Sequence, residues 1–509
     1  MLAGILLVII SALLTALAFP PLNLFWLAFF SLMPLFYAFY RAENYRQVFF
    51  YGALFALIFY LTLLVPIGAA LCEFAAFYWL FLLGVAVYLY LAFFLVGSLL
   101  LAKFVQKQPV SAGFGSVLWS ISACALGWIL FDWLRSLGAF RFTLGSLACT
   151  QYLFLDFIQL ARHTGSYGLT FILIFINACG GIFLARLKTA AAAERRSWAA
   201  LGSALAAAFC LLLLGGRLSL SAPARPAPET KQVAVFQPAI PQQDKLSDDA
   251  SALKRRYLSA LRAYAVEHAP DLLVLPETIV PAFLLEDRDF LFQLRDSLNS
   301  SLVFGTPRRE KKGELYHLYN SAALLNRYGA VTLLHDKKYL VPFGEYLPLR
   351  RLLYPLLGKT GFYDLVYLKG SANQPSAGYS AAICYESIFP YQLREQIRSG
   401  GRLIFVLTND AWFGRSLFLD MHLAFGVLRA VENNRYLVQA ANTGRSFIVD
   451  NRGRILRQSN IDEQEFILAE TQMLDQKTLY TYCGELPIYL ALVFFFLYGY
   501  LFLLRKFRA

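Results

Sequence analysis

Eight long apolar runs constrain the fold of this chain more than any other feature of its sequence. Each run is close to the ~20 residues that an α-helix needs to cross a bilayer. The chain is 58% hydrophobic and only 16% charged, which is too apolar for a wholly soluble protein. We therefore predict eight transmembrane helices, at residues 1–19, 24–40, 49–68, 77–102, 116–134, 166–185, 198–216 and 486–504.

Two of these runs also fit another interpretation. The run at 24–40 is short enough to be a re-entrant segment. The run at 1–19 ends in an Ala-x-Ala-like cleavage site, as a signal peptide does. It lacks a charged N-terminal region, however, and leads directly into Pro20-Pro21 and the next apolar run. We therefore expect the first run to remain a membrane span.

Lysine and arginine residues gather in every second loop between the predicted spans. Eleven of them lie in three short loops and the C-terminal tail, whereas the intervening short loops hold three. Because positively charged short loops stay in the cytoplasm, both chain ends are predicted to be cytoplasmic, and the segment between the seventh and eighth spans faces outward. The eleven are Arg41, Arg46, Lys103, Lys107, Arg186, Lys188, Arg195, Arg196, Arg505, Lys506 and Arg508, and the three are Arg135, Arg141 and Arg162.

The outward segment has the composition of an ordinary soluble domain. Strands rich in Val, Ile and Leu alternate with helices predicted at 246–268 and 420–434, which is typical of a layered α/β domain. Turns at 326–329 and 450–453 predict hairpins and hence a mixed sheet. We divide the chain into a membrane domain of seven spans (1–219), a Pro-rich linker (220–230), an outward domain (231–476), an eighth span (484–504) and a cytoplasmic tail (505–509).

The formal net charge of +13 does not indicate a nucleic-acid partner, because much of the basic excess lies at the edges of the predicted spans. The sequence has no zinc-type cysteine pairs and no phosphate-binding glycine loop, so we expect neither a metal nor a cofactor. Cys384 and Cys483 belong to the outward region, and their spacing neither suggests a disulfide framework nor excludes a bond between them. The other cysteines lie in or beside apolar runs, where we expect them to pack as small apolar side chains: Cys72, Cys124, Cys149, Cys179 and Cys210.

Three residues of complementary chemistry stand where predicted strands end. Glu277 follows "LLVLP", Lys337 follows "VTLLHD" and Cys384 follows "AAI". Reactive side chains collect at strand ends in α/β sheets. A carboxylate can take the proton of a thiol, and an ammonium can stabilise a thiolate and an oxyanion. Taken singly, Cys384 also fits a buried core thiol, Glu277 a solvated strand end and Lys337 one half of a surface Lys-Lys pair.

Four motifs give these residues a wider context. They are "LPET" at 275–278, "DKKYLVPFGEYLP" at 336–348, "CYES" at 384–387 and "TNDAWFG" at 408–414. With the predicted spans and "IQLARHTGSYGLTF" at 158–171, the motifs resemble the carbon–nitrogen hydrolase (nitrilase) superfamily and, within it, the membrane-bound apolipoprotein N-acyltransferases. The resemblance covers essentially the whole chain. It implies eight membrane helices joined to a nitrilase-like αββα sandwich.

The resemblance also implies roles for individual residues. Glu277 matches the general base, Lys337 the oxyanion-stabilising lysine and Cys384 the nucleophile. Further matched positions are accessory or line the site, namely Glu345, Tyr385, Glu386, Asn409 and Trp412. From the residues alone, Glu345 also fits a structural salt bridge, and the two aromatic side chains also fit core packing.

Three departures from the family pattern concern contacts with the substrate. Leu246 stands where a tryptophan is common, Asp132 precedes Trp133 where a glutamate is usual, and Cys483 and Glu485 replace the usual residues before the last span. All three predicted catalytic positions are intact, so the departures put substrate contacts in doubt and not the acyl chemistry.

The resemblance implies that a fatty acyl chain passes from a membrane phospholipid, through a thioester on Cys384, to the N-terminal α-amino group of the diacylglyceryl-cysteine of an apolipoprotein. It implies a monomer in the bacterial inner membrane, without cofactor, whose catalytic domain faces the periplasm. One alternative is a membrane-tethered amidase or nitrilase that hydrolyses a C–N bond. A scaffold or transporter is a further alternative, but most spans lack the paired charges of a transport pathway.

Two apolar stretches near the predicted site, at 279–292 and 347–368, combine bulky apolar and basic residues. We hypothesise that they are mobile arms that enter the headgroup layer and admit acyl chains. The alternative is a helical hairpin packed on the domain.

Overall fold

The computed structural model describes residues 2–71, 77–111, 113–187, 191–223, 229–247, 249–357, 367–371 and 375–508. Within it the chain divides into two compact units. The first unit comprises Met1–Ala222 and Cys483–Ala509, and the second comprises Pro223–Tyr482. The predicted basic residue Lys188, Cys72 and part of the predicted linker lie outside the described residues.

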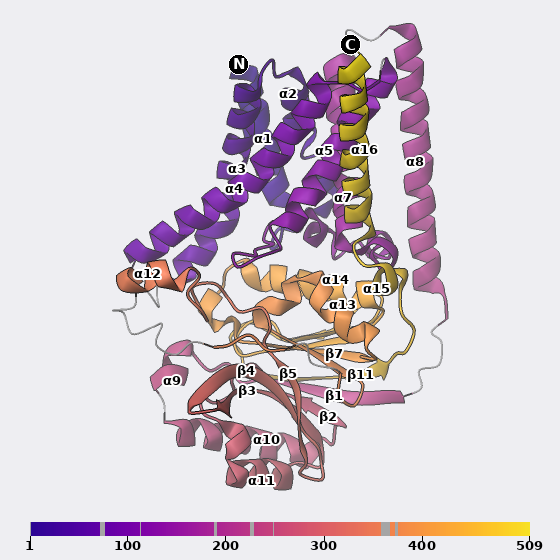
Figure 1. The fold of residues 1–509 in the computed structure, drawn as a ribbon. Coiled ribbons are helices and arrows are strands. Elements are labelled where there is room, and N and C mark those ends of the chain that lie inside the picture. The colour runs from indigo at the N-terminus through magenta and orange to yellow at the C-terminus, as the bar shows by residue number, and fades with distance from the viewer. Residues whose placement is uncertain are drawn as a thin grey trace. The chain divides into compact units, whose positions relative to one another are not determined.

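The regular secondary structure described in the first unit is helical, with turns and loops between the helices (Figure 1). Among the described residues, six helices are long and apolar enough to cross a membrane, and they correspond to six of the eight predicted spans. The first two predicted spans form shorter helices, so the count of eight is not reached by length alone. The helices are α1 (Leu2–Ala18), α2 (Met33–Arg41), α3 (Tyr45–Leu71), α4 (Phe77–Lys107), α5 (Phe114–Leu134), α6 (Leu155–Ile158), α7 (Ala161–Arg186), α8 (Ala192–Ser221) and α16 (Leu486–Arg508), with short 3-10 helices η1 (Phe25–Phe29) and η2 (Leu147–Gln151).

The second predicted span is broken between η1 and α2. A buried amide on α7 compensates for the break, because Asn177 Oδ1 accepts from Leu32 N at 2.8 Å and Asn177 Nδ2 donates to Ala28 O at 2.8 Å. Backbone groups freed by a helix break in an apolar setting need such partners. Pro34 lies in the first turn of α2, where its fixed φ and missing N–H are tolerated.

The charged pair at the end of α5 is structural. Arg135 Nε donates to Asp132 Oδ1 at 2.9 Å, and Arg135 also donates to the carbonyl oxygens of Phe142 and Leu144. Both charged side chains are buried. The ion pair of Asp132 and Arg135 therefore fixes the loop that follows α5.

The second unit contains two mixed sheets. The six-stranded sheet has the order β11-β1-β2-β3-β4-β5 and the five-stranded sheet the order β10-β9-β8-β7-β6. In the first sheet β1, β2 and β3 are parallel and the remaining pairs antiparallel, and in the second β6, β7 and β8 are parallel. The strands are β1 (Glu229–Gln237), β2 (Leu272–Val274), β3 (Ser301–Lys312), β4 (Leu315–Leu325), β5 (Val331–Asp336), β6 (Tyr379–Ile383), β7 (Leu403–Thr408), β8 (Leu437–Ala441), β9 (Phe447–Val449), β10 (Ile455–Gln458) and β11 (Glu465–Met473).

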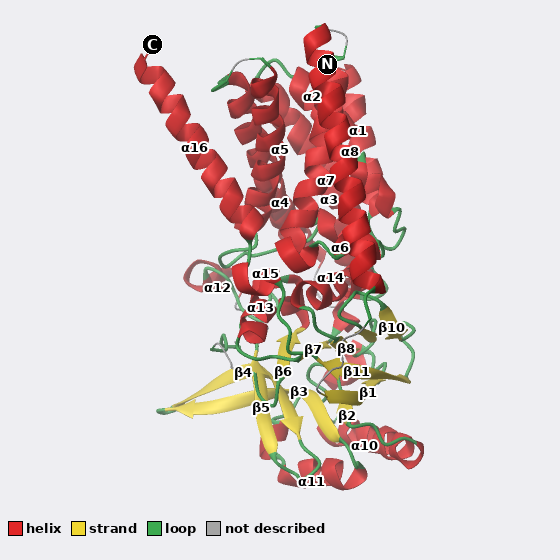
Figure 2. Ribbon diagram, turned by 90° about the vertical axis from the view of Figure 1, so that its right-hand side faces the viewer, coloured by secondary structure: helices red, strands yellow, loops and turns green. Residues whose placement is uncertain are grey.

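Helices cover the outer face of each sheet, so the second unit has four layers (Figures 1 and 2). Apolar side chains of α10 and α11 pack with those of β1, β2 and β3 in one core cluster, while α13 and α14 cover the five-stranded sheet. This arrangement confirms the predicted αββα sandwich with mixed sheets. The helix predicted at 246–268 is divided between two helices. The helices are α9 (Gln242–Ser247), α10 (Ala250–Glu267), α11 (Arg288–Ser297), α12 (Arg350–Leu357), α13 (Pro390–Arg398), α14 (Phe418–Asn433) and α15 (Leu479–Cys483), and the 3-10 helices are η3 (Leu284–Glu286), η5 (Cys384–Ile388) and η6 (Asp410–Phe413).

The two stretches predicted as mobile arms differ in their packing. Most of the apolar side chains at 279–292 belong to the core cluster of the second unit, as the packed alternative requires. Phe292 is an exception, because it is 55% exposed. The second stretch contains α12, beside which Leu349 is 61% exposed, and its residues 358–366 lie outside the described part of the chain.

Candidate active site

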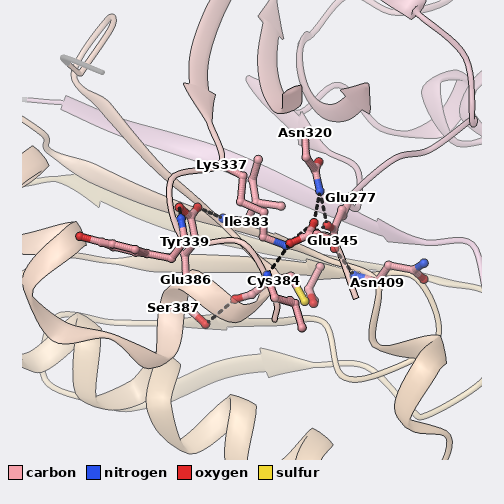
Figure 3. A network of polar contacts seen from close by, with 12 residues as sticks. Glu277, Asn320, Lys337, Tyr339, Glu345, Ile383, Cys384, Glu386, Ser387 and Asn409 are labelled. Carbon is pink, nitrogen blue, oxygen red and sulfur yellow. Dashed lines mark hydrogen bonds and ion pairs between the residues drawn. The ribbon is translucent and has the colours of Figure 1, made fainter. Parts of the chain in front are cut away.

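Cys384 lies at the point where β6 ends and η5 begins, and only 8% of it is exposed. Its φ is +50°, a left-handed value that is uncommon for residues other than glycine. Thr278, directly after Glu277, is also left-handed, with φ +46°. Strained backbone of this kind concentrates at functional sites. Figure 3 shows Cys384 at this turn, together with Glu277, Lys337 and Glu345.

Glu277 lies three residues beyond β2, and β3 passes very close to it. A Cβ added to Gly305 would lie 2.6 Å from the Cα of Glu277, so only glycine allows this approach. The carboxylate is held from two sides. Its Oε2 accepts from the backbone N–H of Asn409 at 3.0 Å, and its Oε1 accepts from Asn320 Nδ2 at 2.6 Å and from Lys337 Nζ at 3.4 Å.

Lys337 follows β5 directly and is almost completely buried, with 1% of its surface exposed. Its Nζ lies 2.9 Å from Glu345 Oε1, in addition to the contact with Glu277. Burial by itself lowers the pKa of Lys337, but the carboxylates of Glu277 and Glu345 outweigh burial and hold the pKa well above its ordinary value. Lys337 is therefore an ammonium at neutral pH and is unsuited to act as a base.

The thiol of Cys384 is protonated in the resting site. Burial raises the pKa of Cys384, the carboxylate of Glu277 raises it further, and the ammonium of Lys337 lowers it. The net effect is a pKa above the ordinary value of a thiol. Because the thiolate and not the thiol is the nucleophile, a reaction at Cys384 requires a base, and the carboxylate of Glu277 is close enough to act on the thiol.

Glu345 contacts the same groups as Glu277 from another segment of the chain. Its Oε1 accepts from Asn320 Nδ2 at 3.0 Å and from Lys337, and its Oε2 accepts from the backbone N–H of Val341 at 2.9 Å. The structural salt bridge considered for Glu345 is therefore present, and its partner is the predicted catalytic lysine.

Glu386 is fully buried and all its acceptor positions are used. Its Oε2 contacts His335 Nε2 and accepts from Ile383 N, both at 2.8 Å, and its Oε1 accepts from Lys338 N at 2.7 Å and Tyr339 N at 3.1 Å. Burial raises the pKa of Glu386, but His335, the backbone N–H of Ile383 and the charge of Lys337 together outweigh burial and hold the pKa below its usual range. Glu386 thus ties the segment after Lys337 to the strand end before the cysteine.

The remaining predicted residues surround this centre. Asn409 supplies its backbone N–H to Glu277, and its side chain bonds to Gln242 and Asn442. Tyr385 is buried and packs edge-on against Phe389, with ring centroids 5.1 Å apart. Trp412 lies in η6 and is half-buried, which does not match a closed core position.

Two residues of the site escaped prediction as functional residues. Asn320 on β4 bridges both carboxylates through one amide group, and its backbone oxygen accepts from Lys337 N at 2.8 Å. Lys245 on α9 is buried and donates to the backbone oxygen of Glu277 at 3.1 Å. Burial lowers the pKa of Lys245 to about 8, although Glu277 acts against that shift. No local signal separates Asn320 from the other polar residues of β4, which include His317 and Ser321.

Neither Cys384 nor Cys483 forms a disulfide in the part of the chain that the structure describes. Within that same part, no cluster of three or more His, Cys, Asp or Glu side chains could hold a metal ion.

Comparison with known proteins identifies the family of this chain. The carbon–nitrogen hydrolase family model matches residues 232–478, and the model of the apolipoprotein N-acyltransferase N-terminal domain matches residues 11–179. A Geobacter metallireducens protein named apolipoprotein N-acyltransferase is 30% identical over 491 residues, which are 94% of this chain and 91% of that protein. The chain belongs to the apolipoprotein N-acyltransferase family.

Other members of the apolipoprotein N-acyltransferase family are similar over much of their length. The Rhizobium etli protein is 31% identical over 389 residues (71% of this chain, 70% of that protein), and the Rickettsia prowazekii protein is 28% identical over 516 residues (97% of each). A crystal structure of a carbon–nitrogen hydrolase from Helicobacter pylori matches with a TM-score of 0.38 and 15% identity, covering 48% of this chain and 89% of that chain. The family membership predicted from the motifs is confirmed, and with its apolar helices the chain is a bacterial membrane protein.

Proposed function

We propose that this chain transfers a fatty acyl group from a membrane phospholipid, through a thioester on Cys384, to the N-terminal α-amino group of a diacylated apolipoprotein. Membership of the apolipoprotein N-acyltransferase family supports the N-acylation. The observation that carries the residue assignment is the buried cluster of Cys384, Glu277 and Lys337, each at the end of a different strand. Glu277 raises the pKa of the Cys384 thiol and Lys337 lowers it.

In the first step Glu277 takes the proton of the Cys384 thiol, and the sulfur attacks the ester carbonyl of the phospholipid. The tetrahedral oxyanion forms beside Lys337, whose pKa keeps it charged throughout. The ester C–O bond then breaks, and the departing alkoxide takes the proton from Glu277 to give a lysophospholipid. A thioester remains on Cys384.

In the second step the α-amino group of the lipoprotein attacks the thioester carbonyl. Glu277 removes the proton that the nitrogen must lose, and the C–S bond breaks as the second oxyanion collapses. The proton on Glu277 returns to the sulfur and restores the thiol. Because an amide is more stable than a thioester, the transfer runs forward, and the two steps give ping-pong kinetics.

Glu345 and Asn320 keep the two charged partners in place during both steps. When Glu277 accepts the thiol proton, it loses its negative charge and its attraction for Lys337 weakens. The contact of 2.9 Å with Glu345 then holds the ammonium in position. Asn320 donates to both carboxylates, so it fixes their separation in either protonation state.

Several features support lipid substrates and an outward-facing site. The loop charges favour a periplasmic catalytic unit in the inner membrane. Around α12, Leu349 and Tyr354 expose apolar surface beside Arg350 and Arg351, a combination typical of segments that enter the headgroup layer. We propose that this segment meets the acyl donor and that the enzyme acts as a monomer. Replacing Leu353 and Tyr354 with Asp is expected to slow the use of phospholipid in membranes, and unchanged turnover would contradict the proposal.

Mass spectrometry of the purified protein after incubation with phospholipid tests the proposed intermediate. We expect a mass increase of one fatty acyl group, located on Cys384 and absent from Cys384→Ser. An unmodified Cys384 under conditions in which lipoprotein is N-acylated would overturn the assignment. A membrane-tethered amidase would instead release the acyl group to water as fast in the absence of an amine as in its presence.

A further inference from the structure

A second chain of polar residues lies behind the nucleophile and has no role in the two proposed steps. It consists of Asp410, His422 and Ser387, which come from η6, α14 and η5. His422 and Ser387 are fully buried and Asp410 is 1% exposed. Buried polar groups of this kind destabilise the fold unless their hydrogen bonds are satisfied, so the hydrogen bonds among these three residues restrict their possible roles.

The contacts run in one line from a carboxylate to the backbone of the nucleophile. His422 Nδ1 lies 3.2 Å from both carboxylate oxygens of Asp410, and His422 Nε2 lies 2.6 Å from Ser387 Oγ. Ser387 Oγ in turn donates to the carbonyl oxygen of Cys384 at 3.0 Å. Figure 3 shows Ser387 beside the cysteine that opens the η5 turn.

Counting hydrogens fixes the direction of these bonds. A carbonyl oxygen only accepts, so the single hydrogen of Ser387 is used on Cys384. Ser387 must then accept from His422 Nε2, which therefore carries a hydrogen. The bond between His422 Nδ1 and Asp410 needs one further hydrogen, on the imidazole or on the carboxyl group. In both cases the pair of Asp410 and His422 carries no net charge.

This neutrality matters because Asp410 acts on the nucleophile. A negative charge on Asp410 that nothing balances would raise the pKa of Cys384, as the charge of Glu277 does, whereas Lys337 lowers it. Thr408 connects the two, since its hydroxyl donates to Asp410 Oδ1 at 2.7 Å and also contacts the sulfur of Cys384. Gly444 packs against the other side, where an added Cβ would lie 2.7 Å from the Cβ of Asp410.

We propose that Asp410, His422 and Ser387 form a positioning relay that fixes the carbonyl group of Cys384 and shields its thiol from the charge of Asp410. A serine often bonds to the carbonyl three residues earlier without further consequence. Here the imidazole leaves Ser387 no other acceptor for its hydrogen, so the left-handed turn at Cys384 is held in one orientation. The inference rests on the proposed role of Cys384 as nucleophile.

The pH dependence of alkylation of Cys384 by iodoacetamide, followed by peptide mass spectrometry on the full-length protein, tests the shielding. His422→Gln keeps an N–H near Ser387 but removes the group that neutralises Asp410. Over a pH range from neutral to alkaline, we expect alkylation about tenfold slower, corresponding to a rise of about one unit in the thiol pKa, because no group then balances the charge of Asp410. Adding Asp410→Asn to His422→Gln is expected to restore most of the rate, because the unbalanced charge is gone.

Ser387→Ala separates positioning from shielding. We expect this variant to keep the alkylation profile of the wild type but to form the acyl adduct at least about tenfold more slowly, a loss equivalent to one poorly placed group in the transition state. His268→Gln, an exposed histidine of the same unit, is the matched control and is expected to change neither rate. Unfolding midpoints identify any variant that fails to fold. If His422→Gln does not fold, Ser387→Ala still tests the relay.

The shielding would be overturned if Cys384 in His422→Gln were alkylated at the wild-type rate across this pH range. It would also be overturned if the double variant were alkylated more slowly than His422→Gln. Wild-type acylation by Ser387→Ala would overturn the positioning. Because alkylation needs no acyl donor, these results differ from failure of the proposed function, in which the wild type itself forms no acyl adduct.

Discussion

Replacement of Lys337 by methionine probes the electrostatics of the site most fully. Methionine fills a similar volume but removes the ammonium that lies 2.9 Å from Glu345 and 3.4 Å from Glu277. Three effects follow. The oxyanion of the proposed mechanism loses its donor, the thiol loses a cation that lowers its pKa, and the carboxylates of Glu277 and Glu345, which share the amide of Asn320, lose their counter-charge.

The magnitude can be worked from these contacts. Loss of one oxyanion-hole donor costs about 10²–10³ in rate, or about 2.7–4 kcal/mol. Each unit by which the pKa of Cys384 rises removes about a further factor of ten at neutral pH. We therefore expect Lys337→Met to form the acyl adduct at least about 10³-fold more slowly than the wild type.

The assay is single-turnover acylation with excess phospholipid, followed by intact-protein mass spectrometry. Lys338→Met is the matched control, because the Lys338 side chain is at the surface, 3.4 Å from the exposed Glu395, and is expected to leave the rate within about threefold of the wild type. Acylation by folded Lys337→Met within about tenfold of the wild-type rate would refute the assigned role of Lys337.

Three further predictions concern stability. The pKa of Glu386 is lowered in the folded state, so its contribution to stability is complete above its unfolded pKa of about 4.3 and is lost as the pH falls through the folded value. The difference in unfolding midpoint between the wild type and Glu386→Gln should therefore become smaller in acid. A difference that does not depend on pH would contradict this prediction. Gly305→Ala places a Cβ 2.6 Å from the backbone of Glu277 and is expected to cost about 1–3 kcal/mol and to slow acylation, as measured by denaturation and the adduct assay. Asn177→Leu leaves two backbone groups unpaired at the helix break and is expected to lower stability in detergent by about 1–3 kcal/mol, whereas an unchanged midpoint would show that water or lipid satisfies them.

The sequence predicts the large-scale architecture well because its signals are long and repeated. Runs of about 20 apolar residues identify the long helices, and alternating strands and helices identify the layered sandwich. The break in the second span cannot be predicted from a local pattern of this kind. It depends on Asn177, which is more than a hundred residues away in sequence and supplies the compensating hydrogen bonds.

Some residues of the candidate site can likewise be predicted from local sequence signals, whereas others come together only in the fold. Glu277, Lys337 and Cys384 are readable because each stands at a strand end in a recognisable motif. Asn320 and His422 are not readable as site residues, because one lies in a strand and the other in a buried helix, and only the fold brings them to the carboxylates and to the turn at Cys384. The apolar stretch at 279–292 shows the converse limit, since composition alone does not separate a lipid-contacting arm from a segment that packs into the core.

The proposed transfer depends above all on the fate of the acyl group on Cys384. The most direct measurement isolates the acylated protein and follows loss of the adduct with and without a diacylated lipopeptide that has a free α-amino group. We predict fast loss only with the lipopeptide, with the acyl group recovered as an amide on that nitrogen. Equal rates of loss in buffer alone, with release of free fatty acid, would contradict transfer and indicate a hydrolase.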